Sequence, residues 1–240
     1  MKASKIALLS LGGIVVGTIV LAAVVARMSV GWVGLGVGQD LPDPGEMTTA
    51  NRDLSGFDSI EINGSWEIDV SRGDQWQVEL SYPENYEGEF EVSVDGDHLS
   101  LGGAGRRSFF GGPDANYAAN IVMPTLVELE IAGSSEVTLA GFQGEQLTID
   151  AAGATQITGE DGRYGELELS LAGAHDIQLA GFVFTDADVD LAGASSVTLT
   201  MDGGELTGSL AGAGEIEYFG TVSREDIDVA GFGSVGPAER

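Results

Sequence analysis

Residues 129–137 read Leu-Glu-Ile-Ala-Gly-Ser-Ser-Glu-Val, and the Ala-Gly pair at their centre recurs five more times at a near-constant spacing. The spacings between successive pairs are 20, 20, 20, 19 and 19 residues. A repeat this short and regular is typical of a solenoid, in which each repeat is one coil stacked on the next. The pairs are Ala132-Gly133, Ala152-Gly153, Ala172-Gly173, Ala192-Gly193, Ala211-Gly212 and Ala230-Gly231.

Around each pair, apolar and polar residues alternate. In the first copy Leu129, Ile131 and Val137 are apolar, and almost every other copy has an apolar residue at the same offsets. Alternation with period two indicates strands, and 20 residues leave no room for a strand plus a crossover helix. The sequence therefore predicts an all-β parallel β-helix whose coils each contain two short strands, joined at an Ala-Gly corner where Gly can adopt positive φ.

Residues 51–126 predict less regular coils of the same solenoid. Residues 59–70 alternate in the same way, with Asn63-Gly64 at the corner, and residues 77–80 predict a further strand. Residues 90–94 and 98–101 predict two strands joined by the turn Asp95-Gly96-Asp97. We expect the β-helix domain to span residues 51–236, followed by a tail at 237–240. Because stacked strands expose their edges at both ends, we expect caps from the first coil and from residues 233–240.

The N-terminal part differs from the rest. Residues 6–26 carry no charge, and as a helix they would span about 31 Å, enough to cross a membrane. We expect residues 1–27 to be an uncleaved membrane anchor, with a cleaved signal peptide as the alternative. Lys2 and Lys5 favour a cytoplasmic N-terminus, which makes this a single-pass membrane protein with its domain outside the cytoplasm. Residues 28–50, rich in Gly with Pro42 and Pro44, predict a flexible linker.

Charge and cysteine content exclude several classes of function. All 38 acidic residues and seven of the ten basic ones lie in residues 39–240, which gives this stretch a net charge of −31 without a single lysine. Such a balance argues against nucleic-acid binding and against docking on anionic lipid head groups. The absence of cysteine excludes disulfides, a zinc–thiolate site and a thiol nucleophile.

Two further motifs accompany the repeat. They are Arg52-x-Leu54-x-Gly56-Phe57-x-x-Ile60 and Val122-x-Pro124-x-Leu126-x-x-Leu129, followed by corners such as Ala132-Gly133-Ser134-Ser135-x-Val137. Together the motifs resemble the GIN-domain family, described as the head domain of autotransporter adhesins in bacterial envelope proteins, over about residues 51–236. The resemblance implies a right-handed parallel β-helix and an envelope location, which would place the expected anchor in the bacterial inner membrane, and it brings no established catalytic residue.

Carboxylates recur three and five residues before the repeat glycine. Stacking places members of one such column about 4.8 Å apart, where oxygen ligands could hold a hard cation such as Ca²⁺. The alternative is a solvated face that keeps the rod soluble, with hydroxyl residues in the columns relieving repulsion. Calcium is the only cofactor that the sequence suggests. The candidate ligands form two groups, Glu128/Glu130/Asp150 and Glu168/Asp188/Asp190.

Residues 102–117 predict a long loop that could bind a partner. It carries Arg106-Arg107 beside Phe109-Phe110, and Arg and aromatic residues are enriched at recognition hot spots. The alternative is a connection without a binding role.

Little in the chain predicts catalysis. The repeat region holds only Arg163 and Arg224 as basic residues, and His175-Asp176 at one corner is interpreted as surface. We therefore expect a non-catalytic binding protein whose partner is an unknown envelope protein or glycan. The runner-up is a scaffold that self-associates into homo-oligomers through β-helix ends or faces, and a glycan-active enzyme is the least favoured class.

Overall fold

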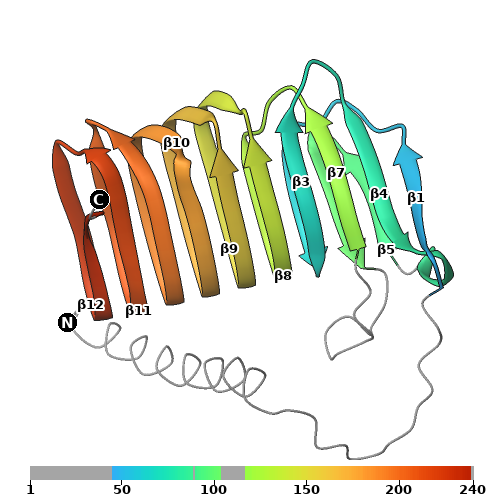
Figure 1. Ribbon diagram of the computed structural model, residues 1–240. Helices are drawn as coiled ribbons and strands as arrows, with labels where there is room; N and C mark the ends of the chain where they lie inside the picture. The colour runs from blue at the N-terminus through green and yellow to red at the C-terminus, as the bar shows by residue number, and fades with distance from the viewer. Residues whose placement is uncertain (1–44, 89, 104–116, 239–240) are drawn as a thin grey trace, which may run out of the picture.

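The computed structural model describes residues 45–88, 90–103 and 117–238, and these residues form one twelve-stranded sheet wound into a solenoid (Figure 1). One short 3-10 helix, η1 (Glu84–Tyr86), follows the fourth strand. The strands are β1 (Met47–Arg52), β2 (Ser59–Gly64), β3 (Trp66–Arg72), β4 (Gln77–Pro83), β5 (Phe90–Asp95), β6 (His98–Gly103), β7 (Tyr117–Met123), β8 (Glu128–Ala140), β9 (Gln143–Glu160), β10 (Gly162–Asp202), β11 (Glu205–Thr221) and β12 (Arg224–Pro237).

The Ala-Gly repeat forms the regular part of the stack, from β8 to β12. Neighbouring strands are parallel, and their register aligns Gly133 with Gly153, Gly153 with Gly173, and Gly212 with both Gly193 and Gly231. The long strand β10 contains two successive corners, so the five strands supply six coils. The coil predicted from the spacing is confirmed.

Stacking explains why glycine recurs at each corner. The backbone of Gly173 has φ +143°, a conformation that residues with a side chain rarely adopt. A Cβ at this position would also lie 2.0 Å from the carbonyl oxygen of Gly153 in the preceding coil. Each corner therefore requires glycine both for its own conformation and for close contact with the coil beneath it.

The core is the inside of the coils. The residues four and two before the repeat glycine and four after it are buried in the central coils, as their alternation predicts. Three rings, those of Tyr164, Phe182 and Phe184, pack against one another with centroids 6.0–6.4 Å apart. The Tyr164 hydroxyl donates a hydrogen bond of 2.8 Å to the backbone carbonyl of Leu126. Burial raises the pKa of Tyr164, so this hydroxyl stays protonated and holds the bond.

The N-terminal half contributes two more coils in an order that differs from the chain order. Strands β2 and β3 pair in parallel with β8, and Gly64 aligns with Gly133, which confirms Asn63-Gly64 as a corner. On their other side β2 and β3 pair in parallel with β6 and β7. The chain therefore builds the β6–β7 coil outside the β2–β3 coil before β8 returns to the inner side.

Antiparallel strands finish this end of the stack. Strand β4 lies antiparallel between β7 and β1, and β5 forms the predicted hairpin with β6. The strand predicted at residues 77–80 thus belongs to a cap and not to a coil. The cap begins with β1 at Met47, four residues before the domain start expected from the sequence.

The other end of the stack is β12. The C-terminal tail was predicted as a cap, but residues 233–237 continue β12 in register with β11, so they form part of the last coil instead. The predicted anchor at residues 6–26 and the linker up to residue 44 lie outside the described residues. Within the described ranges, no helix has the length and apolar character needed to span a membrane.

Candidate functional site

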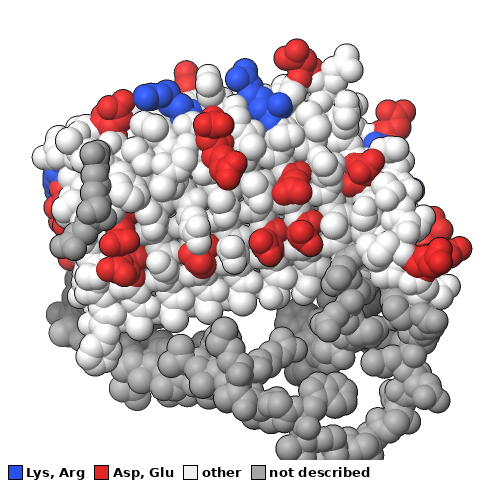
Figure 2. Space-filling view, in the orientation of Figure 1, with Lys and Arg blue, Asp and Glu red and all other residues white. Residues whose placement is uncertain are grey.

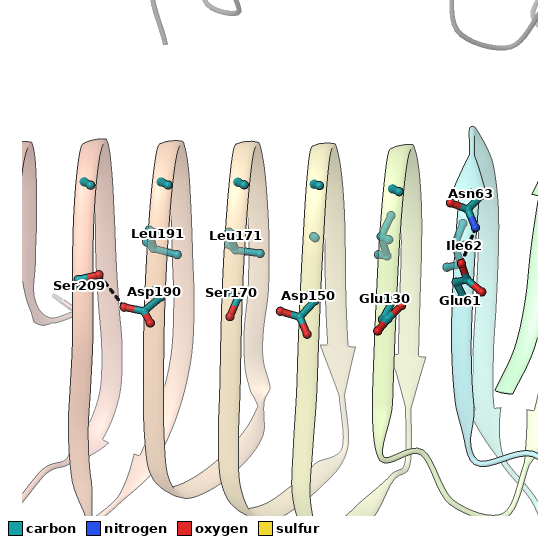
Figure 3. Close-up of a pocket in the computed structure, with 17 residues that line it drawn as sticks. Glu61, Ile62, Asn63, Glu130, Asp150, Ser170, Leu171, Asp190, Leu191 and Ser209 are labelled. Atoms are coloured by element: carbon teal, nitrogen blue, oxygen red, sulfur yellow. Dashed lines mark hydrogen bonds between the residues drawn. The ribbon is translucent and has the colours of Figure 1, made fainter. Parts of the chain in front are cut away.

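A groove of about 500 Å³ crosses the coils on one face of the solenoid (Figure 3). Its floor contains the residues immediately before the corner glycines, which we call the alanine row. Beside it runs the acidic row, formed by the residues three before each corner glycine. The alanine row is Ala132, Ala152, Ala172, Ala192 and Ala211, and the acidic row is Glu61, Glu130, Asp150, Ser170, Asp190 and Ser209.

The groove follows from the strand alternation. Side chains one and three residues before a corner glycine point to the same outer face, because successive side chains alternate across a strand. A methyl group at every alanine position leaves a trough, while the longer acidic side chains rise beside it. Ile131, Leu171 and Leu191 add apolar lining. The result is an apolar floor with carboxylates along one edge.

Two of the four carboxylates in the acidic row accept hydrogen bonds from neighbouring side chains. Asn63 Nδ2 donates to Glu61 at 2.8 Å, and Ser209 Oγ donates to Asp190 at 2.6 Å. In the described structure, the ion pairs of arginine lie outside the groove. Arg163 pairs with Asp202 at 3.1 Å, and Arg224 pairs with Glu205 and Asp226. Figure 2 shows Asp and Glu side chains spread over the face in view, where Lys and Arg side chains are few.

The six residues predicted as calcium ligands lie in the two expected columns, and hydroxyl residues interrupt both columns. Glu130 and Asp150 are neighbours in adjacent strands. Thr148 lies between Glu128 and Glu168 in the other column, and its hydroxyl donates to Glu168 at 3.4 Å. Among the side chains that the structure describes, no three acidic or histidine residues converge closely enough to hold a metal ion. Calcium binding by these columns, which also include Asp188 and Asp190, therefore stays a prediction.

The predicted partner loop lies outside the described residues, so Arg106, Arg107, Phe109 and Phe110 are not placed. The strand that follows it begins within an aromatic cluster. The ring of Tyr117 lies 5.2 Å from that of Trp66 and 5.4 Å from that of Phe90, and Tyr82 lies 4.8 Å from Phe90.

The interpretation of His175 as surface is wrong, because its side chain points into the solenoid and is only 5% exposed. It belongs to an interior polar row, the residues two after the corner glycines, with Ser135, Thr155 and Ser195. Burial lowers the pKa of His175, and the nearby carbonyl of Ala172 offsets this only in part. Neither ring nitrogen has a well-formed hydrogen bond. A neutral, enclosed imidazole is badly placed for acid–base chemistry on an external substrate.

Sequence reasoning missed both the alanine row and the interior polar row. The first was interpreted only as a turning device, although the alternation also places those residues on the outer face. For the second, the same alternation put position 175 inside, but the adjacent Asp176 suggested an exposed pair.

Several solved protein structures are similar to this one. Among solved structures, a "putative adhesin" from Bacteroides fragilis is similar with a TM-score of 0.61 and 15% identity, over 80% of this chain and 97% of that chain. One from Parabacteroides merdae has a TM-score of 0.48 and 15% identity (81% and 97% covered). A "putative lipid binding protein" from Parabacteroides distasonis has a TM-score of 0.46 and 16% identity (81% and 98% covered). At 15% sequence identity, the similarity to the Bacteroides fragilis structure shows only that the two proteins share a fold.

No curated protein matches the chain. A family model described as "Putative auto-transporter adhesin, head GIN domain" matches residues 56–185 and 167–238, which together cover most of the chain. The predicted family resemblance is thereby confirmed, and the chain belongs to this family of GIN head domains.

Proposed function

We propose that the chain is a membrane-tethered, non-catalytic binding module of the bacterial envelope, and that its groove binds a positively charged segment of another envelope component. In this proposal residues 6–26 cross the inner membrane once with a cytoplasmic N-terminus, and a right-handed solenoid lies on the far side. The family description as an adhesin head domain supports a binding role.

The observation that carries the proposal is the combination of an apolar floor with carboxylates that have no cationic partner among the described residues. Acidic side chains without a cation are stabilised when a basic group approaches them. The net charge of −31 on residues 39–240 attracts cations over a longer range and would speed their association. A polyanionic glycan would be repelled by the same field.

The lining of the groove suits a basic peptide. Glu61, Glu130 and Asp150 lie on three adjacent coils, so their carboxylates recur at about 4.8 Å along the stack. Lys and Arg have aliphatic stems that pack on apolar surface while their charged ends reach a polar edge. The alanine row would receive the stems, and the acidic row would bind the charged ends.

A direct test uses the full chain in mild detergent and a fluorescently labelled basic peptide of alternating Lys and Ala residues, with fluorescence anisotropy as the measurement. We expect Glu130→Gln/Asp150→Asn to weaken binding about tenfold or more, since two charged contacts at the edge of the groove are lost. The matched control, Glu136→Gln/Glu160→Gln, removes the same charge from exposed positions outside the groove lining and should have a much smaller effect.

A third variant tests whether the shape of the groove affects peptide binding in addition to its charge. Ala172→Leu fills the exposed alanine row without changing the net charge, and we expect it to weaken binding as well. Equal losses for both charge pairs, together with no effect of Ala172→Leu, would show that the peptide senses only the overall charge and would contradict the groove.

The predicted loop at residues 102–117 is a separate candidate contact for the envelope component in this proposal, apart from the basic segment bound by the groove. The variant Arg106→Ala/Phe109→Ala tests it, and unchanged capture of that component would leave the loop as a connection. The scaffold alternative is favoured by a different observation, the apolar side chains Val229 and Phe232 that β12 exposes at the end of the stack.

A further inference from the structure

The last coil leaves a strand edge and core positions uncovered. Strand β12 is the terminal strand of the sheet order, and no residue in the described ranges pairs with its second edge (Figure 1). Two residues before the corner glycine, Leu210 is 1% exposed, whereas Val229 in the next coil is 46% exposed. Phe232, just after the last corner, is 91% exposed. A strand edge with exposed apolar side chains is a template for pairing with another strand.

Charge divides β12 into two halves. Before the corner at Gly231 it carries Arg224, Glu225, Asp226 and Asp228, while residues 229–237 carry no charge. Arg224 already pairs with Asp226 and with Glu205 of the preceding strand. The first half of one copy would repel the first half of another, but it can lie opposite an uncharged half without placing like charges together.

We propose that two copies of this chain join end to end through β12, with antiparallel edges related by a two-fold axis at Gly231. Placing corner on corner sets Val229 of each copy opposite Gly233 of the other, and Ile227 opposite Val235. Inward positions then meet inward positions, as strand pairing across a common core requires. Asp228 lies opposite Ser234, and every carboxylate of β12 faces the uncharged half of the partner.

This arrangement accounts for the features of the free edge. The pairing supplies hydrogen-bond partners for the second edge of β12 and covers Val229 with the end of a second core. Phe232 is brought opposite Ala230 of the other copy, whose small side chain leaves space. The same patch serves both copies, as a two-fold interface demands. The ends closed by β1 and β5 then point away from the join.

The inference does not rest on the groove, and salt separates the two. Two rods of like charge repel, so screening by salt should strengthen the end-to-end contact. Binding of a basic peptide to the acidic row should weaken with salt. If only one of the two interactions exists, the direction in which added salt changes its affinity shows which proposal holds.

Sedimentation velocity on the full chain in mild detergent, over a wide concentration range and with calcium or a chelator, tests association. We expect a reversible dimer whose dissociation constant rises about tenfold or more in Phe232→Asp, since a charge would have to be buried in the interface. With 91% of its surface exposed, Phe232 can be replaced without disturbing the core. The matched control is Met47→Asp, which introduces the same charge at an apolar, 56% exposed residue of β1 at the opposite end.

Three outcomes would overturn the proposal: a monomer at every concentration, the same effect from Met47→Asp, or association that occurs only with calcium. The last would instead indicate that the acidic columns bridge two chains through cations.

Cross-linking tests the register directly, since the chain has no cysteine. We expect a mixture of Asp228→Cys and Ser234→Cys proteins to form a disulfide-linked dimer under mild oxidation, whereas each variant alone does not. Equal cross-linking in the separate samples would contradict the two-fold register, even if dimers form.

Discussion

The two ends of the solenoid are built on the same kind of coil, yet they finish differently. At one end β4 and β1 extend one side of the stack and β5 extends another, all antiparallel, around the aromatic cluster of Tyr82, Phe90, Trp66 and Tyr117. At the other end β12 simply repeats the coil and leaves Val229 and Phe232 exposed. The comparison shows that the Ala-Gly repeat propagates a stack but does not terminate it. At the capped end the stack is closed by antiparallel strands, and these strands come from sequence outside the repeat.

The largest effect that we expect comes from substituting a corner glycine, which tests whether glycine is needed for contact between coils or only for the turn. In Gly173→Ala the new Cβ would lie 2.0 Å from a backbone oxygen of the coil beneath, and backbone cannot move away without opening the stack. We expect the free energy of unfolding to fall by more than about 4 kcal/mol, measured by chemical denaturation with circular dichroism. Gly56→Ala is the control, because Gly56 also has positive φ (+88°) but its Cβ would meet nothing within 4 Å. That variant should lose only about 1 kcal/mol, and equal losses would contradict a role in stacking.

The second prediction compares aromatic residues at the two ends. Trp66 is buried and packs edge-on against Phe90 at 5.8 Å, so Trp66→Ala should cost about 3–5 kcal/mol of the free energy of unfolding. Phe232→Ala removes an exposed ring and should change monomer stability by less than about 0.5 kcal/mol. Thermal and chemical denaturation at low protein concentration measure both. A comparable loss in Phe232→Ala would mean that the C-terminal end is covered within the monomer.

The third prediction concerns the interior polar row. Burial lowers the pKa of His175 below its ordinary value of 6.5, so the unfolded chain takes up a proton that the folded chain resists. Above pH 6.5 both states are neutral at this site. As the pH falls below 6.5, the free energy of unfolding should decrease by up to about 1.4 kcal/mol per pH unit.

His175→Thr, which copies the residue of the preceding coil, should remove this slope between pH 5 and 6.5. The control is His98→Gln, because the His98 side chain is 40% exposed beside Asp97 and Glu128 and its loss should leave the slope in place. An unchanged slope in His175→Thr would show that the imidazole is hydrated in the folded chain.

The regular coils could be predicted because each rule they obey is local. Alternation around Gly133 identifies the inward residues, and the spacing of the pairs sets the length of the coil. The hairpin of β5 and β6 was also predicted, since Asp95-Gly96-Asp97 is a turn signal between two alternating segments. These patterns depend only on neighbours within one repeat.

Long-range pairing could not be predicted in the same way. The residues of β4 alternate like those of a coil, and nothing in Gln77–Pro83 tells whether its partners run parallel or antiparallel. The placement of β6–β7 outside β2–β3 depends on contacts between distant strands, which alternation does not encode. The groove was missed for a related reason, because an alanine such as Ala152 forms a trough only when the coils on both sides also carry alanine.

The smallest effects that we expect concern the interior polar row, in which Ser135 of β8 and Thr155 of β9 occupy equivalent positions in neighbouring coils. Ser135 accepts a hydrogen bond from the backbone N–H of Trp66 and donates one to the carbonyl of Gly64, both at 3.3 Å. These two bonds join β8 to the β2–β3 coil. The hydroxyl of Thr155, one coil further on, is buried without a partner. Ser135→Ala should therefore lower the free energy of unfolding by about 1–2 kcal/mol, since it leaves a buried N–H unsatisfied. Thr155→Val keeps the shape and removes the unpaired hydroxyl, so it should raise stability by about 1 kcal/mol. Denaturation curves of the two variants should thus move in opposite directions, and destabilisation by both would mean that the interior row is hydrogen-bonded throughout.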